Sequence, residues 1–310
     1  MWFNGRFSLQ RNKTMPAFWM IVSCLLFACM GVCVKLAADT FSTGETVFWR
    51  GLVSMLMMAA LALANGVSLR TPHWRMHLSR SVSGSIALGC YFFAIGMLPL
   101  ATAVTLNYTS PLFVALLLVL VFGERLNGYG SLAILAGFAG VVLLLRPTLQ
   151  PEQWLGAVAG LGSGALASIA YVSLRELGRA GEPEVRTVFW FSLMTTAMGL
   201  AWALSGELHR PDAAGFATLL GIGLFGGLAQ LAMTRSYRYG RTVVSANLSY
   251  ATVVFASLFG MLLWDELMPA SSWAGVALIV TGAIGVSLAT RRQAVRQHTD
   301  AAVAQQADVL

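Results

Sequence analysis

Long apolar runs follow one another along almost the whole chain. A helix needs roughly 20 apolar residues to cross the hydrocarbon core of a bilayer. Composition agrees with repeated crossings, because 57% of the 310 residues are hydrophobic and 11% are charged, whereas soluble domains carry about 25% charged residues. We therefore expect an all-α integral membrane protein. Its ten predicted transmembrane helices lie at residues 16–36, 45–64, 81–98, 101–122, 129–145, 154–174, 186–204, 214–234, 242–264 and 272–289.

A short polar pattern occurs once in each half of the chain. Leucine, a polar residue, tyrosine, any residue and a hydroxyl residue stand in that order at Leu106–Ser110 and again at Leu248–Thr252. Each copy leads into an apolar run that ends at a glutamate, Glu124 in the first half and Glu266 in the second. The sequence Thr-Val-Phe-Trp also occurs twice with nearly the same separation, at residues 46–49 and 187–190.

These matches predict that the chain contains one unit twice. Each unit would hold five helices, and because five is odd, the two units would cross the membrane in opposite orientations, as in many secondary transporters. The prediction is two inverted five-helix repeats, at residues 16–146 and 154–290. They stand between an N-terminal segment, 1–15, and a C-terminal tail, 291–310.

The basic residues predict how the helices are oriented, since lysine and arginine near helix ends are held on the cytoplasmic side. With the N-terminus inside, most of the 20 basic residues fall in cytoplasmic segments, Arg70, Arg75 and Arg80 among them, and the outside loops hold only Arg146 and Arg210. We expect a multi-pass protein of the cytoplasmic membrane with both termini cytoplasmic. This placement accounts for the net charge of +7 without a nucleic-acid partner, and it leaves monomer and homodimer open.

The sequence gives no sign of a metal, a cofactor or an ATP site. Its four cysteines lie inside predicted spans, with no paired Cys/His spacing of the kind that binds zinc. No GxxxxGK[ST] motif occurs, so the chain has no P-loop of its own. We expect a protein without enzymatic activity that uses a gradient. An enzyme is the weaker alternative, with His73 and His77 of an arginine-rich loop as its candidates.

Polar positions kept in both copies predict a binding surface. With the two copies aligned, Thr105 matches Asn247, Asn107 matches Ser249, and Tyr108 matches Tyr250. Retained polarity with changed identity favours a wet or ligand-contacting surface, while the alternative is hydrogen bonding between helices, worth about 0.6 kcal/mol each. The predicted substrate-binding residues are Arg50, Tyr91, Thr105, Asn107, Tyr108, Tyr171, Gln230, Asn247, Ser249 and Tyr250.

Two basic residues fall inside predicted spans. Lys35 can extend its ammonium group to the outer interface. Arg50 either pairs with Glu45 or Asp39, or faces a watery cavity and contacts a substrate carboxylate or phosphate. Cations near tyrosines favour a zwitterionic or anionic, partly aromatic metabolite.

Another group of residues is expected to shape or gate the helices. Pro111 cannot donate to the carbonyl of Asn107 and should bend its helix, whereas the matching Val253 predicts no bend in the second half. The two run-ending glutamates are expected at membrane interfaces. Gating or structural roles are therefore assigned to Lys35, Pro111, Glu124 and Glu266.

A set of residues in both halves matches the pattern of a known family: Ser110–Phe113, Phe122–Leu126, Gly137 to Gly140, Phe255, Trp264–Leu267, Gly282, Gly31 with Lys35, and Arg50. By these residues the chain resembles the drug/metabolite transporter superfamily, in its EamA-type ten-helix group. This resemblance implies a cytoplasmic-membrane carrier whose cavity is lined mainly by helices 1, 3, 4, 6, 8 and 9, with helices 5 and 10 as outer supports. One departure is Asp265, where the family usually has glycine before the second glutamate.

The function expected from the sequence is secondary transport by alternating access. The cargo would be a small zwitterionic or anionic metabolite, such as an amino acid or a vitamin. Proton coupling usually needs an acid or histidine deep in the membrane, and each Asp and Glu lies near a predicted helix end or loop, which favours uniport or exchange. The alternatives are a proton-coupled drug or metabolite exporter and a non-transporting membrane factor.

Overall fold

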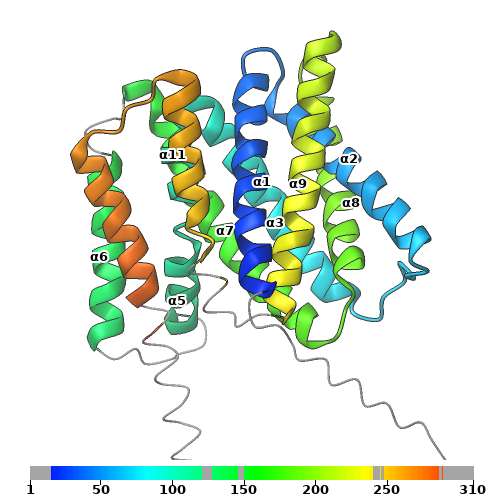
Figure 1. Ribbon diagram of the computed structural model, residues 1–310, viewed down its shortest axis with the longest axis horizontal. Helices are drawn as coiled ribbons and strands as arrows, with labels where there is room; N and C mark the ends of the chain where they lie inside the picture. The colour runs from blue at the N-terminus through cyan, green and yellow to red at the C-terminus, as the bar shows by residue number, and fades with distance from the viewer. Residues whose placement is uncertain are drawn as a thin grey trace, which may run out of the picture.

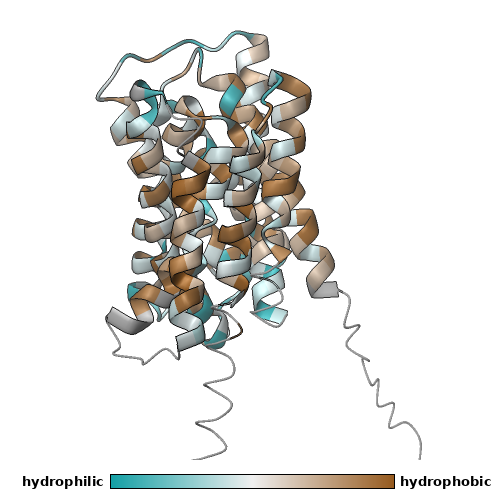
Figure 2. Cartoon of the chain, turned by 90° about the vertical axis from the view of Figure 1, so that its left-hand side faces the viewer, coloured by the Kyte–Doolittle hydropathy of each residue, from teal (hydrophilic) through white to brown (hydrophobic). Residues whose placement is uncertain are grey.

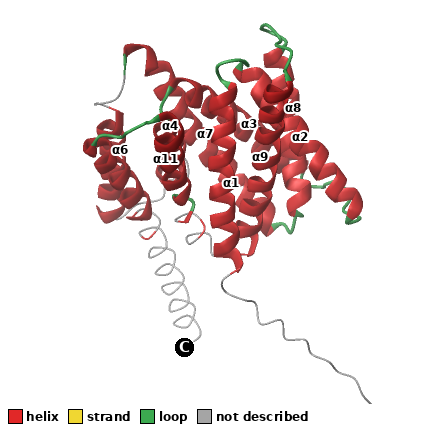
Figure 3. Cartoon of the chain, turned by 45° about the horizontal axis from the view of Figure 1, so that its top comes forward, coloured by secondary structure: helices red, strands yellow, loops and turns green. Residues whose placement is uncertain are grey.

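The computed structural model describes residues 15–120, 128–145, 150–239, 245, 248–285 and 288. Across these ranges the regular elements are helices (Figures 1 and 3). Five of them are long and apolar enough to cross a membrane, namely α1, α2, α3, α7 and α9. The bounds are α1 Met15–Ala37, α2 Thr43–Ala64, α3 Trp74–Met97, α4 Leu100–Asn107, α5 Ser110–Leu120, α6 Gly128–Leu145, η1 Pro151–Gln153, α7 Trp154–Arg179, α8 Glu184–Ala203, α9 Ala213–Tyr239, α11 Ala251–Trp264 and a last described helix, Ala270–Gly285.

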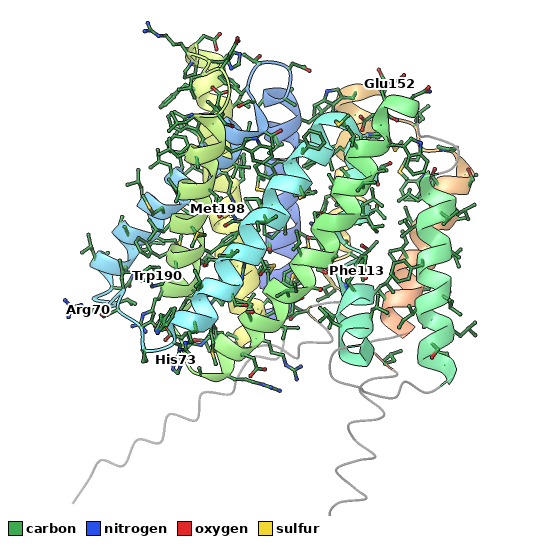
Figure 4. All side chains as sticks on the ribbon, turned by 180° about the vertical axis from the view of Figure 1, so that it is seen from behind. Arg70, His73, Phe113, Glu152, Trp190 and Met198 are labelled. Atoms are coloured by element: carbon green, nitrogen blue, oxygen red, sulfur yellow. The ribbon has the colours of Figure 1, made fainter. Side chains whose placement is uncertain are left out.

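The surface of the bundle has the banding of a membrane protein. Apolar residues cover the middle of the helices, and polar residues gather toward the two ends (Figure 2). In Figure 1, α1 begins and the last described helix ends at the lower end of the bundle. Arg70 and His73 also lie at this lower end (Figure 4). The basic loops and both ends of the described chain thus share one side.

One predicted boundary is wrong in a way that matters. The apolar run predicted a helix from residue 81, but α3 begins at Trp74 and includes His77 and Arg80. A hydropathy criterion rejects this polar stretch, although both side chains are 3% exposed because α3 turns them into the bundle. Arg80 is therefore an interior charge and not a cytoplasmic loop residue.

The two tyrosine segments both break their helices. As predicted from Pro111, the first helix is interrupted, with α4 ending at Asn107 and α5 beginning at Ser110. The prediction of no bend in the second half is wrong, because the turn at Ser249–Tyr250 directly precedes α11. No proline is needed there, since the turn closes with tight hydrogen bonds from Thr252 N to Ser249 O and from Val253 N to Tyr250 O, each 3.0 Å long.

Helices of the first half pack on helices of the second. The main pairs are α1 with α9, α3 with α7, and α2 with α8, while α4 meets α11. Helices α1 and α7, which are counterparts in the predicted repeat, run in opposite directions. In Figure 1 α1 runs upward. In Figure 4 α7 starts beside Glu152 at the upper end and runs downward. Both views keep the same vertical direction, so the opposition is real.

Glycines on the second-half helices permit this close packing. A methyl group at Gly160 would lie 3.0 Å from Leu106 Cδ1, and one at Gly164 would lie 2.9 Å from the carbonyl oxygen of Leu106. One at Gly223 would lie 2.3 Å from Cβ of Val53 on α2. Gly160 and Gly164 are four residues apart on α7, a spacing that lets helix backbones approach closely.

The helix α6 and the last described helix form a separate pair at the edge of the bundle (Figure 1, left). Their backbones come close at Gly140, where an added Cβ would lie 2.7 Å from the carbonyl oxygen of Gly275, and at Gly282 beside Gly137. These helices correspond to the predicted helices 5 and 10. They support the bundle without lining its cavity.

Candidate functional site

A cavity lies inside the bundle among seven helices. Its free volume is about 70 Å³. One water molecule needs about 10–15 Å³ of such space. We call it the central cavity. It is lined by Phe27, Met30, Arg50, Arg80, Gly84, Ala87, Leu88, Tyr91, Asn107, Tyr108, Ala167, Ala170, Tyr171, Phe191, Gln230 and Met233.

Two arginines dominate the chemistry of the central cavity. Arg50 of α2 is 1% exposed and Arg80 of α3 is 3% exposed. Both pack on the ring of Phe191 from α8, with guanidinium carbons 4.7 Å and 4.2 Å from the ring centroid. The two guanidinium carbons therefore lie no farther apart than the sum of these two distances. Two permanent positive charges therefore share one aromatic ring.

Within the described part of the chain, neither arginine has an ion-pair partner. Arg50 Nε and Nη1 and Arg80 Nε are buried without a hydrogen-bond partner among the described residues. The expected pairing of Arg50 with Glu45 or Asp39 is wrong. The Glu45 carboxylate instead accepts from Ser42 N at 2.8 Å and from His209 N at 2.6 Å, which caps the start of α2 and ties down the loop before α9.

The energetics of these arginines favour a ligand. Removing a charged group from water costs several kcal/mol. A cation–π contact with one ring returns about 2 kcal/mol when desolvated, and here one ring serves both arginines. The described residues that line the cavity include no carboxylate. The contacts among the described residues therefore do not offset the burial of these two charges.

Two glycines provide the room that the arginines occupy. A Cβ at Gly84 would lie 2.1 Å from Arg80 Nη1 and 3.0 Å from the Phe191 ring. A Cβ at Gly226 on α9 would lie 3.2 Å from Arg50 Nε. Any larger residue at Gly84 would push the Arg80 guanidinium group away from the ring.

The tyrosine segments meet where the helix breaks face each other. The rings of Tyr108 and Tyr250 are 6.2 Å apart at 54°, and Thr252 Oγ1 donates a 2.9 Å hydrogen bond to Tyr108 Oη. Both tyrosines are buried, at 8% and 6% exposure, so they face the interior. Tyr108 lines the central cavity, while Tyr250 packs behind it.

A charged cluster lies at the upper end of the bundle. Lys35 in the last turn of α1 forms an ion pair with Glu266, which follows α11, and it also lies 5.1 Å from the ring centroid of Trp264. Glu266 Oε2 accepts a 2.9 Å hydrogen bond from Leu100 N at the start of α4. Lys35 therefore does not extend alone into the interface as expected, because a carboxylate lies within reach. The cluster joins three segments above the cavity.

A second space, the basic cavity, lies toward the opposite end. Its free volume is about 310 Å³. The charged residues that line it are Arg175, Arg179, Glu182 and Arg238. Tyr237 also lines it. The Tyr237 ring stacks on Tyr171, with centroids 6.3 Å apart at 26°, and Tyr171 lines the central cavity. This stacked pair lies between the two spaces.

Six of the residues predicted from the sequence line the central cavity: Arg50, Tyr91, Asn107, Tyr108, Tyr171 and Gln230. Asn107 is held in place by a 2.9 Å hydrogen bond from its Nδ2 to Ser163 Oγ. Thr105 lies off the cavity and donates to Ala101 O of its own helix. Ser249 and Tyr250 form the second helix break, and Pro111 lies in the first turn of α5. Asn247 and Glu124 lie outside the described residues.

Sequence reasoning missed Arg80 and Phe191. The family resemblance did not imply helices 2 and 7 as lining helices, yet α2 supplies the predicted residue Arg50 and α8 supplies Phe191. One available signal was the pair Arg80 and Gly84, one helical turn apart, since a small residue on the same face leaves space for a long side chain.

Comparison with known proteins decides the family. The family model described as "EamA-like transporter family" matches the chain twice, at residues 14–146 and 154–288. The chain belongs to the EamA-like transporter family. This makes it a multi-pass membrane transporter of the drug/metabolite type, as the sequence predicted.

Named EamA relatives span nearly the same length. The pseudopaline exporter CntI of Pseudomonas aeruginosa is 31% identical, over 86% of this chain and 94% of its own. A riboflavin transporter of Brucella anthropi is 24% identical, over 88% of this chain and 97% of its own. A solved crystal structure with 23% identity matches with a TM-score of 0.67, over 91% of this chain and 99% of its own, and it shows the same fold.

Proposed function

We propose that the chain is a secondary transporter that carries a small anionic or zwitterionic, partly aromatic metabolite across the cytoplasmic membrane by alternating access. The observation that carries this proposal is Arg50, a fully buried guanidinium group that lines the central cavity without an acidic partner among the described residues. A planar, permanently charged fork of this kind suits carboxylate or phosphate groups. The tyrosines around it offer hydroxyl groups and aromatic faces to the remainder of the cargo.

The architecture that we propose is a pair of inverted repeats with both termini cytoplasmic. Three observations support it: the family model matches each half, counterpart helices run in opposite directions, and helix pairs exchange between halves, α1 with α9 and α3 with α7. The basic residues at the lower end support a cytoplasmic lower side.

Two contacts are proposed as gates. The ion pair of Lys35 with Glu266 closes the outer end, where it ties α1 to the start of α4 through Leu100. The stacked pair of Tyr171 and Tyr237 separates the central cavity from the basic cavity on the cytoplasmic side. Alternating access then requires that each contact forms when the other opens.

The proposal is tested by metabolite profiling of cells. Intracellular and medium pools of anionic metabolites are compared by mass spectrometry between cells that express the wild-type chain and cells that carry an empty vector. We expect at least one pool to move across the membrane with the wild-type chain, and Arg50→Gln to remove the effect at equal expression. Arg75→Gln, on an exposed residue of α3, is the matched control. Equal pools in the first comparison would refute transport, and an active Arg50→Gln chain would refute the site.

A second candidate function, proton-coupled export, has one observation in its favour. His77 is 3% exposed, and its Nε2 lies 3.4 Å from Glu182 Oε2, one helical turn from Arg80. The sequence placed His77 in a loop, where it could not couple to the cavity. If protons drive transport, a pH gradient across proteoliposomes will accelerate it, and His77→Gln will remove that acceleration while leaving exchange without a gradient intact.

A further inference from the structure

Resting on the proposed function, we infer that the cargo carries two anionic groups on one short molecule, as a dicarboxylate does, and that Arg50 and Arg80 each bind one of them. Nothing in the names of the relatives assigns Arg80 a role. The inference stands on the number, burial and placement of the charges, as follows.

The first step is the number of charges. Both guanidinium groups are permanently positive at physiological pH. Both line the same cavity, and the described lining residues provide no carboxylate. A ligand with a single negative charge leaves one buried arginine uncompensated. A ligand with two negative charges neutralises both.

The second step excludes the nearby acids as internal partners. Glu182, on the side of Arg80, is engaged by Arg186 at 2.9 Å and by Thr71 at 2.7 Å. Glu45, on the same helix as Arg50, is held by Ser42 and His209. Glu182 and Glu45 are therefore committed to other partners.

The third step is the placement of the two arginines. They come from different helices, α2 and α3, and the Phe191 ring keeps them 4.7 Å and 4.2 Å from its centre. The two side chains pack directly against Gly84 and Gly226, where a Cβ would lie 2.1 Å from Arg80 Nη1 and 3.2 Å from Arg50 Nε. Two forks on separate helices can each bind one carboxylate of a short dicarboxylate, and inorganic phosphate is the compact dianion against which this is tested.

The fourth step concerns what surrounds the charges. Tyr91, Asn107 and Gln230 are uncharged polar residues that also line the cavity. They can bind a neutral or polar substituent between the two carboxylates. The site thus selects for charge number first and tolerates variation in the middle of the cargo.

The test measures equilibrium binding to the purified full-length chain in detergent. The probes are glutarate, its monoamide and inorganic phosphate. We expect glutarate to bind at least tenfold more tightly than the monoamide or phosphate. Arg50→Gln and Arg80→Gln should each lower the glutarate-to-monoamide ratio to about two or less, while Arg75→Gln keeps it.

Two further variants keep the test decisive if Arg80→Gln does not fold. Arg80→Lys keeps the charge and loses the fork, and Gly84→Ala moves the Arg80 guanidinium group by steric contact. Both should reduce the ratio at least threefold. Equal affinity for glutarate and its monoamide, no binding of either, tighter binding of phosphate, or an unchanged ratio in the folded Arg80 variants would overturn the two-point site. The metabolite profile would still support transport if a singly charged anion moved across the membrane, so the two failures are distinguishable.

Discussion

The ion pair of Lys35 with Glu266 gives the sharpest prediction of the proposed gating. Both side chains are largely buried, with 15% and 16% exposure, and Glu266 also accepts from Leu100 N. Breaking a buried, hydrogen-bonded pair by removing one partner typically costs 2–5 kcal/mol. Because these groups keep some contact with water, we take the lower end, about 2 kcal/mol. If the pair forms only in the state closed at this end, Lys35→Gln shifts the equilibrium toward the open state by roughly 30-fold.

The assay is chemical labelling from the side that Lys35 faces. Ala87 lines the central cavity and is replaced by cysteine in a chain whose Cys24, Cys29, Cys33 and Cys90 are changed to serine. A membrane-impermeant maleimide is added to the outer side of intact cells. We expect labelling of the introduced cysteine to accelerate at least tenfold in Lys35→Gln and more in Glu266→Gln, because the glutamate also holds the start of α4. The charge exchange Lys35→Glu with Glu266→Lys should recover part of the closure.

The matched control is Asp39→Asn, which removes an exposed charge just beyond α1. It should leave the labelling rate within a factor of two of the parent. Unchanged labelling in both gate variants, with unchanged thermal unfolding, would show that the pair does not hold the outer end closed. Equal acceleration in Asp39→Asn would show that the rate reports general loosening of this end.

Three further predictions follow from single contacts. Tyr237→Ala removes the ring that stacks on Tyr171, so labelling of the same cavity cysteine from the cytoplasmic side, in inverted vesicles, should rise at least fivefold while labelling from the outside does not rise. Burial opposes ionisation of Glu182, but hydrogen bonds from Thr71 and Arg186 outweigh this effect and lower the pKa of the Glu182 carboxyl below 4.5. The ionised carboxylate therefore stabilises the fold above pH 4.5, and this stabilisation is lost as the pH falls through the lowered pKa. Glu182→Gln should flatten the acid dependence of the thermal unfolding temperature in that range. Gly140→Leu places a side chain at a position where even a Cβ would lie 2.7 Å from the carbonyl oxygen of Gly275 on the last described helix. It should therefore lower the unfolding temperature by several degrees while leaving the affinity for glutarate unchanged.

Hydropathy predicted most of the fold because the bilayer makes an apolar run of sufficient length a strong constraint. It failed where tertiary contacts, and not lipid, decide the structure. The first turns of α3 are too polar to count as a membrane span, yet they pack inside the bundle with His77 and Arg80 buried. The break at Ser249–Tyr250 contains no proline, and it was missed because its hydrogen bonds form between groups that sequence spacing does not single out.

The sequence predicted those residues of the candidate site that belong to the repeated polar pattern. Tyr108 and Tyr250 stand at matching positions, and the repeat located both in the interior. Arg80 lies outside any repeated pattern, and it is the folding of α3 against α8 that brings it to Arg50. Its contact with Phe191 joins α3 to α8 across the bundle, and the local pattern offers only the neighbouring Gly84 as a sign of it.

Under the proposed repeat, the shape of the central cavity follows from symmetry and its chemistry follows from departures from symmetry. Arg50 and Phe191 are counterparts after the two Thr-Val-Phe-Trp segments, and in the structure they touch, as residues close to a two-fold axis must. Tyr108 and Tyr250 are also counterparts of each other, and their rings form a pair. In the pair of Arg50 and Phe191 the two halves differ, since the first half provides a cation and the second half provides an aromatic ring that binds it. Arg80 then adds a second charge to that ring from the first half alone. A symmetric frame can thus bind an asymmetric, doubly charged cargo. Exchanging the pair as Arg50→Phe with Phe191→Arg should preserve folding while removing the preference for glutarate over its monoamide, because the moved charge would take the place of the ring that now packs 4.2 Å from the Arg80 guanidinium carbon, and one ring would no longer hold both forks.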